Sequence, residues 1–91
     1  MSEGSSGWYV YIVRCADDTL YTGVTTDTRR RLNEHNLNNR LGAKYTRTRR
    51  PVSLVFKEAC ANRSAACKRE VEIKKMSRTA KLKLLQDLHE Q

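Results

Sequence analysis

Residues 8–36 have the sequence WYVYIVRCADDTLYTGVTTDTRRRLNEHN, and this stretch decides the fold. Its first part, residues 8–15, is rich in aromatic and β-branched side chains, which favour a β-strand. Asp17 and Asp18 favour a turn, because short acidic side chains accept hydrogen bonds from the backbone two residues further on. The strand pattern resumes over residues 19–24. Together the two runs predict a β-hairpin.

A basic helix is predicted directly after the hairpin. Asp27 is suited to cap it, because its carboxylate can accept hydrogen bonds from the free amides of the first turn, so we expect a helix over residues 28 to about 38. Arg31 and His35 are four residues apart and therefore share one face of this helix. The clearly apolar side chains of the helix are only two, Leu32 and Leu37. Much of its surface should therefore be exposed to solvent, as in a helix that lines a cleft.

The remainder of the chain predicts one further strand and two further helices. Residues 52–59, VSLVFKEA, have the composition of a strand. Asn62 or Ser64 can cap a helix that ends near residue 76, and Ser77 can cap a final helix with leucines at helical spacing. Between the first helix and the third strand we expect a surface loop or a short turn.

These elements predict an α+β fold in the order ββαβαα, with a three-stranded, mostly antiparallel sheet flanked by helices. We expect the small polar residues 1–7 to form a flexible leader and residues 8–91 to form a single domain. The sequence has no stretch near the roughly 20 apolar residues that a membrane span needs. We therefore expect a cytoplasmic protein without a membrane partner. A monomer is favoured, with the oligomeric state left open.

The chain is strongly basic, with 18 Lys and Arg against 10 Asp and Glu and a formal net charge of +8. Residues 29–50 alone hold eight basic side chains and one acid, Glu34. Such a field attracts polyanions, of which nucleic acid is the usual one, although basic runs are also often just a solvated face. Tyr45 interrupts the basic segment and offers a surface for base stacking. The candidate nucleic-acid-binding residues are Arg29, Arg30, Lys44, Tyr45, Arg47, Arg49 and Arg50.

Glu70 is singled out by its position on the second long helix. Projected at 100° per residue, it lies on the same stripe as Ala66 and Ile73, whereas Glu72 points almost to the opposite side. An ionised carboxylate among apolar side chains costs free energy unless a cation or a metal compensates it. Glu70 is therefore a candidate ligand or, alternatively, a structural partner of a nearby cation such as Lys74.

Two triplets and their spacing carry a family resemblance. Tyr9-Val10-Tyr11 and Tyr21-Thr22-Gly23 stand in the hairpin, Arg31 and His35 follow Tyr21 by ten and fourteen residues, and Glu70 follows on a later helix. In this respect residues 8 to about 80 resemble the GIY-YIG nuclease superfamily. The resemblance is strongest to its small stand-alone bacterial subgroup, which is also similar at residues 42–51, GAKYTRTRRP.

The resemblance implies a metal-dependent endonuclease that hydrolyses phosphodiester bonds in DNA, in DNA repair or on branched DNA. It implies Tyr11 as the group that orients or deprotonates water, Tyr21 as its partner against the phosphate and Arg31 as the phosphate clamp. His35 would assist as a hydrogen-bond donor or acceptor. Glu70 would hold one divalent ion, Mg2+ or Mn2+.

Two departures from the family pattern keep another class of function open. Tyr9 replaces the glycine of the first triplet, and the asparagine that many members carry after the glutamate helix is not apparent near Ser77. The alternative is a non-catalytic nucleic-acid-binding module with a degenerate nuclease site. RNA is a further partner that the basic segment allows, through stacking on Tyr45.

A shared site places a condition on the hairpin. Tyr11 and Tyr21 both have odd numbers, and directly paired residues of an antiparallel ladder point to the same face. A two-residue turn at Asp17 and Asp18 would pair odd residues with even ones and separate the two tyrosines. We therefore predict a connection of odd length or a bulge.

Overall fold

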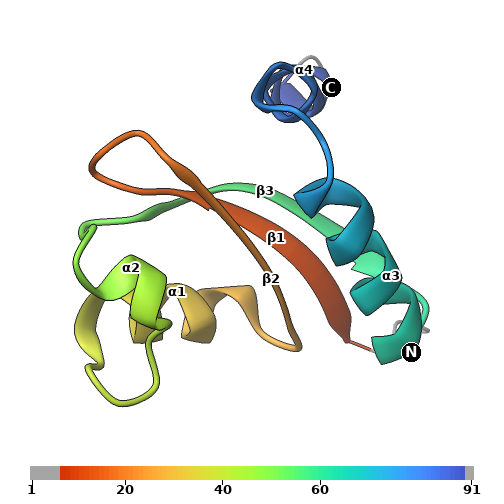
Figure 1. The fold of residues 1–91 in the computed structure, drawn as a ribbon. Coiled ribbons are helices and arrows are strands. Elements are labelled where there is room, and N and C mark those ends of the chain that lie inside the picture. Colours follow the sequence, from red (N-terminus) through yellow and green to blue (C-terminus); the bar gives the residue numbers. More distant parts are fainter. Residues whose placement is uncertain (1–6, 90–91) are drawn as a thin grey trace.

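The computed structural model describes residues 7–89, with side chains described as far as Gln86. Apart from Gly7, the predicted leader lies outside the described residues. The elements in chain order are β1 (Trp8–Arg14), β2 (Leu20–Thr25), α1 (Thr28–Leu37), α2 (Lys44–Arg47), β3 (Ser53–Cys60), α3 (Arg63–Lys74) and α4 (Arg78–His89). Figure 1 shows the three strands side by side, with α1 and α2 at one side of the sheet and α3 and α4 away from them.

The sheet has the order β2-β1-β3, and β1 pairs antiparallel with both neighbours. The predicted α+β fold and the order of its long elements are confirmed. The one addition is α2, a single helical turn in the segment for which a loop or a short turn was expected.

The hairpin connection has the odd length that a shared site requires. Arg14 pairs with Leu20, so that five residues, 15–19, make the turn. Asp18 takes a φ of 69°, and the amide of Cys15 donates to the carbonyl of Thr19 at 2.8 Å. As a result Val13 pairs with Tyr21, and Tyr21 lies on the same face as Tyr11. The prediction of an odd connection is confirmed.

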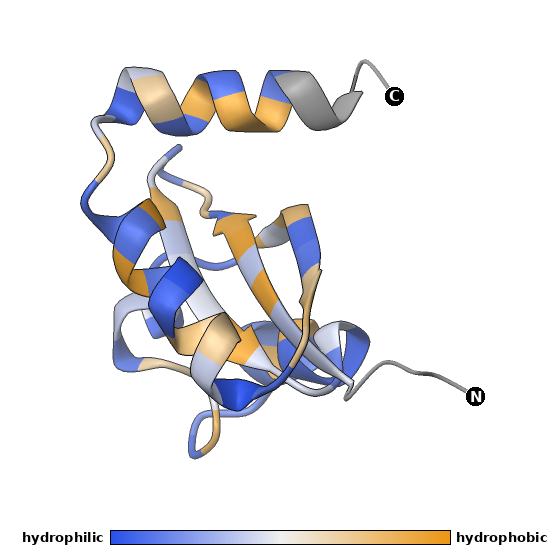
Figure 2. Ribbon diagram, turned by 90° about the vertical axis from the view of Figure 1, so that its right-hand side faces the viewer, coloured by the Kyte–Doolittle hydropathy of each residue, from blue (hydrophilic) through white to orange (hydrophobic). Residues whose placement is uncertain are grey.

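The two faces of the sheet carry separate cores. Val10 and Ile12 of β1 point to the face covered by α3 and α4, where they pack with Ile73 and Leu85. Tyr11 and Val13 point to the other face, where Leu32 of α1 packs against them. Figure 2 shows α4 crossing above the sheet as a helix whose hydrophobic bands alternate with hydrophilic ones. The site face is therefore the α1 side of the sheet.

A β-bulge interrupts the expected alternation of β3. Ile12 pairs with Phe56 and Val13 with Leu54, so Val55 is the extra residue. Strict alternation would place Val52, Leu54 and Phe56 on one face. The bulge instead sends Phe56 to the α3 side and leaves Leu54 on the α1 side. Both cores gain an apolar residue from one short strand, which a simple parity argument cannot give.

The three predicted helix starts are confirmed by their caps. The carboxylate of Asp27 accepts from the amide of Arg30 at 3.0 Å, and the side chain of Asn62 accepts from that of Ala65 at 2.8 Å. Ser77 Oγ accepts from the amide of Ala80 at 3.1 Å. Within residues 7–89, each helix is too short or too polar to cross a membrane.

Candidate active site

The hydroxyl of Tyr11 reaches the edge of the sheet by passing over a glycine. Tyr11 pairs directly with Gly23 of β2, and a Cβ built on Gly23 would lie 2.6 Å from the phenol oxygen. Any side chain here would therefore push the ring away, because real Cβ atoms do not approach other atoms so closely. The glycine of the second triplet thus makes room for the tyrosine of the first.

His35 of α1 meets this phenol in the interior of the site. Its Nε2 lies 2.8 Å from the oxygen of Tyr11, and its Nδ1 lies 2.8 Å from Thr46 Oγ1. His35 is fully buried, and α1 has no other buried side chain. Burial and the charge of Arg31 lower the pKa of His35 to about 4. The imidazole is therefore neutral at physiological pH.

Burial acts on Tyr11 in the opposite sense. Desolvation of the phenolate raises the pKa of Tyr11 to about 12, and the hydrogen bond and charge of Arg31 offset only part of this rise. Tyr11 is only 2% exposed. A phenol with this pKa is protonated at neutral pH, so Tyr11 can act as a base only if another group takes its proton.

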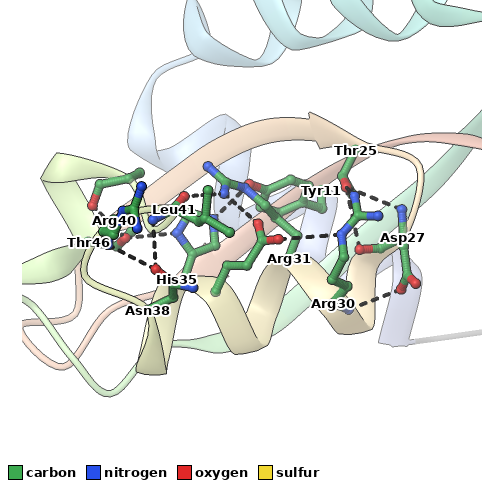
Figure 3. A network of polar contacts seen from close by, with 12 residues as sticks. Tyr11, Thr25, Asp27, Arg30, Arg31, His35, Asn38, Arg40, Leu41 and Thr46 are labelled. Carbon is green, nitrogen blue, oxygen red and sulfur yellow. Dashed lines mark hydrogen bonds and ion pairs between the residues drawn. The ribbon is translucent and has the colours of Figure 1, made fainter.

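Arg31 stands beside Tyr11 and is held from two sides. Its Nη1 lies 2.7 Å from Glu34 Oε1 and donates to the carbonyl of Leu41 at 2.6 Å. Figure 3 shows its guanidinium next to the hydroxyl end of Tyr11. The site therefore holds a guanidinium beside the phenol, in an ion pair with Glu34.

Tyr21 completes the same face through ring contacts. Its ring stands edge-on to His35 with centroids 5.4 Å apart and stacks on Tyr45 at 5.7 Å with an interplanar angle of 23°. The guanidinium of Arg49 covers the ring of Tyr45 at 3.9 Å. Two partners thus flank the ring of Tyr45, so a nucleobase would have to displace Arg49 to stack there.

Glu70 lies on α3, which packs against the face of the sheet opposite to α1. Its charge contributes to the raised pKa of Tyr11, which places the two groups within electrostatic reach of each other. The side chain of Glu70 is 22% exposed and Oε2 lies 3.1 Å from Lys74 Nζ, whereas the side chain of Glu72 is 63% exposed and pairs with Arg69. The predicted contrast between an inward Glu70 and an outward Glu72 is confirmed. Glu70 also has the cationic partner that the structural alternative required.

The donor set around Glu70 suits one kind of metal only. Among residues 7–86 no three His, Cys, Asp or Glu side chains lie close enough to hold an ion. A single carboxylate fits a hard divalent ion such as Mg2+, which keeps most of its water and borrows phosphate oxygens from a substrate. It does not fit zinc, which takes three or four protein ligands.

The basic side chains of this segment differ in how far they are exposed and in whether they hold other elements in place. Arg50 donates to the carbonyls of His35 at 2.6 Å and Asn38 at 3.2 Å, and so caps the end of α1. Arg49 Nε lies 3.0 Å from Asp17 Oδ2 and ties α2 to the hairpin turn. These two arginines have structural partners. The candidates with exposed side chains are Arg29 and Arg30 on α1 and Lys44 and Arg47 on α2.

The structure adds residues that the sequence did not single out. Thr46 is fully buried against His35, and Glu34 bridges Arg31 and Arg30. The sequence could have indicated Glu34, because it lies three residues after Arg31 on the same helix face. It could not have indicated Thr46, because this residue reaches His35 only through the placement of α2.

Tyr9 also lies on the site face, two residues before Tyr11 on β1. Lys57 of β3 pairs directly with Tyr11 and carries its ammonium 5.5 Å from the ring of Tyr9. Tyr9, which replaces the glycine of the first family triplet, thus adds an aromatic ring with a nearby cation to the face that carries Tyr11.

Comparison with known proteins places this chain among related sequences. Residues 7–83 match the GIY-YIG catalytic domain family. A UPF0213 protein of Desulfotalea psychrophila is 58% identical over 78 residues, which are 86% of this chain and 70% of the relative. A UPF0213 protein of Staphylococcus haemolyticus is 52% identical over 79 residues, 87% of this chain and 94% of that protein.

Two solution NMR structures are also similar. The UPF0213 protein of Bacillus halodurans has a TM-score of 0.56 at 43% identity, covering 87% of this chain and 82% of that one. A protein from E. faecalis has a TM-score of 0.64 at 40% identity, covering 99% and 94%. With its hairpin, its α1 helix and Tyr11 and Tyr21 on one face of the sheet, this chain belongs to the GIY-YIG catalytic domain family.

Proposed function

We propose that this protein is a metal-dependent endonuclease that hydrolyses phosphodiester bonds in DNA. The observation that carries the proposal is the 2.8 Å contact between the Tyr11 hydroxyl and Nε2 of the buried, neutral His35, with Arg31 beside them. Hydrolysis of a phosphodiester needs a base for water and positive charge for the phosphate. The three side chains supply both.

The raised pKa of Tyr11, about 12, argues against a free phenolate and for a relay. In this relay the Tyr11 hydroxyl donates its hydrogen to His35 Nε2, which lies 2.8 Å away. As water attacks phosphorus, the phenol oxygen takes the proton of the water while its own proton passes to His35 Nε2. The water oxygen forms the new P–O bond, the bond to the leaving sugar oxygen breaks, and one proton ends on the imidazole. Arg31 stabilises the charge that grows on the phosphate.

Glu70 is the residue that would hold the metal. A bound Mg2+ or Mn2+ there would supply Lewis-acid stabilisation of the leaving oxygen. Before that, the carboxylate must release Lys74, which lies 3.1 Å from Oε2. One carboxylate with a competing ammonium predicts weak metal binding without a substrate.

The nucleic acid would lie along the α1 and α2 side of the sheet. Arg29, Arg30, Lys44 and Arg47 are exposed there, and they can pair with phosphates on either side of the cleaved bond. We place the activity in the cytoplasm and infer that it acts in DNA repair or on branched DNA. RNA remains a second ligand for the same surface.

A binding module without turnover is the second candidate, and a specific observation favours it. Arg31 is paired with Glu34 and Glu70 with Lys74, so both charged groups of the site already have internal partners. In this case the protein would bind nucleic acid with the expected dependence on salt and would leave it intact.

A nicking assay separates the two candidates. Wild-type protein is incubated with branched, linear and single-stranded DNA and with RNA, each with and without Mg2+ or Mn2+, alongside Tyr11→Phe. The nuclease proposal expects metal-dependent products from wild type and a loss of at least about 100-fold in the variant, because the general base is gone. Tight binding with no product on any substrate supports the binding module, and equal cleavage by Tyr11→Phe overturns the relay.

A further inference from the structure

The hydrogen bonds of Thr46 give this buried residue a role beyond packing. Thr46 stands in α2 and is fully buried. Its hydroxyl lies 2.8 Å from His35 Nδ1 and donates to the carbonyl of Ala43 at 3.1 Å. A hydroxyl has a single hydrogen. If that hydrogen goes to the carbonyl, the hydroxyl oxygen is left to accept from His35.

The other end of the chain of contacts requires the same direction. The positive charge of Arg31 lies beside the Tyr11 hydroxyl (Figure 3), and a guanidinium offers no acceptor for the phenol hydrogen. The hydrogen of the protonated phenol therefore needs another acceptor. His35 Nε2 is the acceptor, at 2.8 Å. Because Tyr11 is 2% exposed, bulk water does not compete for that hydrogen.

We propose that Thr46 is a positioning residue that holds neutral His35 in the tautomer with hydrogen on Nδ1 and the Nε2 lone pair facing Tyr11. Every hydrogen bond then runs in one sense: Tyr11 donates to His35, His35 to Thr46 and Thr46 to the carbonyl of Ala43. The ends fix the direction, since Arg31 offers the phenol hydrogen no acceptor and a carbonyl has no donor.

The tautomer decides whether the relay can operate. With the hydrogen on Nε2, the imidazole would donate to the phenol and could not take its proton. The catalytic meaning of Thr46 therefore rests on the proposed function, whereas the tautomer itself does not. Groups that orient a catalytic or ligating histidine through its second nitrogen act in this way in other enzymes.

The location of Thr46 gives α2 a second use. Lys44 and Arg47, which flank Tyr45 and Thr46, are exposed. The turn that would contact phosphates thus also carries the hydroxyl that orients His35 and the ring that stacks on Tyr21. A shift of α2 would therefore change the hydrogen bond between Thr46 and the imidazole of His35.

The test begins with the wild-type protein, so that it does not depend on any variant folding. Imidazole 15N and 1H NMR at pH 7 distinguishes the nitrogen that carries hydrogen from the bare one. We expect His35 to show hydrogen on Nδ1 and a bare Nε2. Hydrogen on Nε2, or an even mixture of the tautomers, overturns the proposal whether or not the protein cuts DNA.

The variants then assign this preference to Thr46. Thr46→Val keeps the shape and removes the hydroxyl, Thr46→Ser keeps the hydroxyl, and Thr48→Val is the control, because Thr48 is exposed at the end of α2. Thr46→Val should shift His35 toward the other tautomer and lower the cleavage rate about 10- to 100-fold. Thr46→Ser should restore both, and Thr48→Val should change neither.

Each result has one meaning. A Thr46→Val protein that keeps the wild-type tautomer overturns the positioning role, even if its activity falls with its melting temperature. A tautomer shift in Thr46→Val that Thr46→Ser reverses supports the role, even if wild type cuts no substrate, and in that case only the nuclease proposal fails.

Discussion

Tyr11 and Gly23 are directly paired across β1 and β2, and the phenol ring of Tyr11 lies over the glycine. The phenol oxygen and Cζ of Tyr11 would be 2.6 and 2.8 Å from a Cβ at position 23. The first and second triplets of the hairpin are therefore one structural unit. One supplies the phenol, and the other supplies the space through which the phenol reaches His35.

This relationship predicts the effect of Gly23→Ala. The added methyl group should displace the ring of Tyr11 from His35, lower the stability by about 1–3 kcal/mol and reduce cleavage. In a Tyr11→Ala background the same substitution should cost less than half as much, because the ring is gone. Denaturant unfolding of the four proteins in this cycle gives the coupling directly. Equal costs in both backgrounds would show that the glycine serves another purpose.

The pKa of His35 predicts how stability depends on pH. Burial, aided by Arg31, lowers the pKa of His35 from 6.5 to about 4. Between pH 4 and pH 6.5 the unfolded chain therefore binds a proton at this residue that the folded protein does not. As the pH falls from 6.5 to 4, the free energy of unfolding should decrease by about 3 kcal/mol. Urea unfolding at several pH values measures the slope, and His35→Gln should flatten it. A slope that is the same in both proteins contradicts the low pKa.

Glu70→Gln tests the metal assignment. The amide keeps the shape but loses the charge, so cleavage should fall by orders of magnitude while DNA affinity without metal stays the same or rises slightly. The ion pair with Lys74 is half exposed and contributes at most about 1 kcal/mol, so the melting temperature should change little. Lys74→Gln should tighten metal binding by removing the competing ammonium.

Glu72→Gln is the matched control for this experiment. Glu72 lies on the same helix, is exposed and pairs with Arg69, so its loss should change neither cleavage nor metal binding. If Glu70→Gln still cuts at the wild-type rate, or loses activity only in proportion to its melting temperature, the metal assignment is wrong.

Substitutions in the basic segment should have two different effects, one on nucleic-acid binding and the other on stability. Replacing Lys44 and Arg47 by Gln should weaken binding on all sequences and lower the salt slope by about one per lost phosphate contact, with stability unchanged. Arg50→Gln removes charged hydrogen bonds to the end of α1 and should lower stability by about 1–3 kcal/mol. Fluorescence anisotropy at several salt concentrations and thermal unfolding separate the two. If the salt slope is the same after Lys44 and Arg47 are replaced, these side chains do not contact phosphates and form only a solvated face.

Local patterns sufficed to predict the elements that carry the site. The capping carboxylate of Asp27 sets the start of α1, and hence the common face of Arg31 and His35. The odd numbers of Tyr11 and Tyr21, together with the shared site that the family resemblance implies, were enough to infer an odd connection. Each of these inferences uses contacts between residues close in sequence, or the fixed period of a strand or helix.

The features that the sequence did not predict depend on contacts between residues far apart in the chain. Nothing in the sequence distinguishes Arg47, which is exposed, from Arg50, whose partner carbonyls are those of α1. Thr46 reaches His35 only because α2 folds back onto α1. The bulge at Val55 arises from packing on both faces of the sheet and has no glycine to mark it.

A final prediction concerns the pair formed by Tyr9 and Lys57 on the site face. Lys57 pairs with Tyr11 on β3, and its Nζ lies 5.5 Å from the ring of Tyr9. A nucleotide next to the cleaved phosphate can stack on this ring and place its own phosphate at the ammonium. Tyr9→Ala should therefore weaken binding of single-stranded DNA about 5- to 100-fold and of duplex DNA less, because paired bases are already stacked. Tyr9→Phe should bind like wild type.

The chain contains a matched control for this pair. Trp8 points to the opposite face of β1, and the guanidinium of Arg63 lies 5.8 Å from its ring. Lys57→Gln and Arg63→Gln each remove one positive charge beside an aromatic ring, so they change the net charge equally. If nucleic acid lies on the site face, Lys57→Gln should weaken binding and lower the salt slope, while Arg63→Gln should do neither. Equal losses in both variants would mean that binding follows the net charge and that the Tyr9 face has no special part in it.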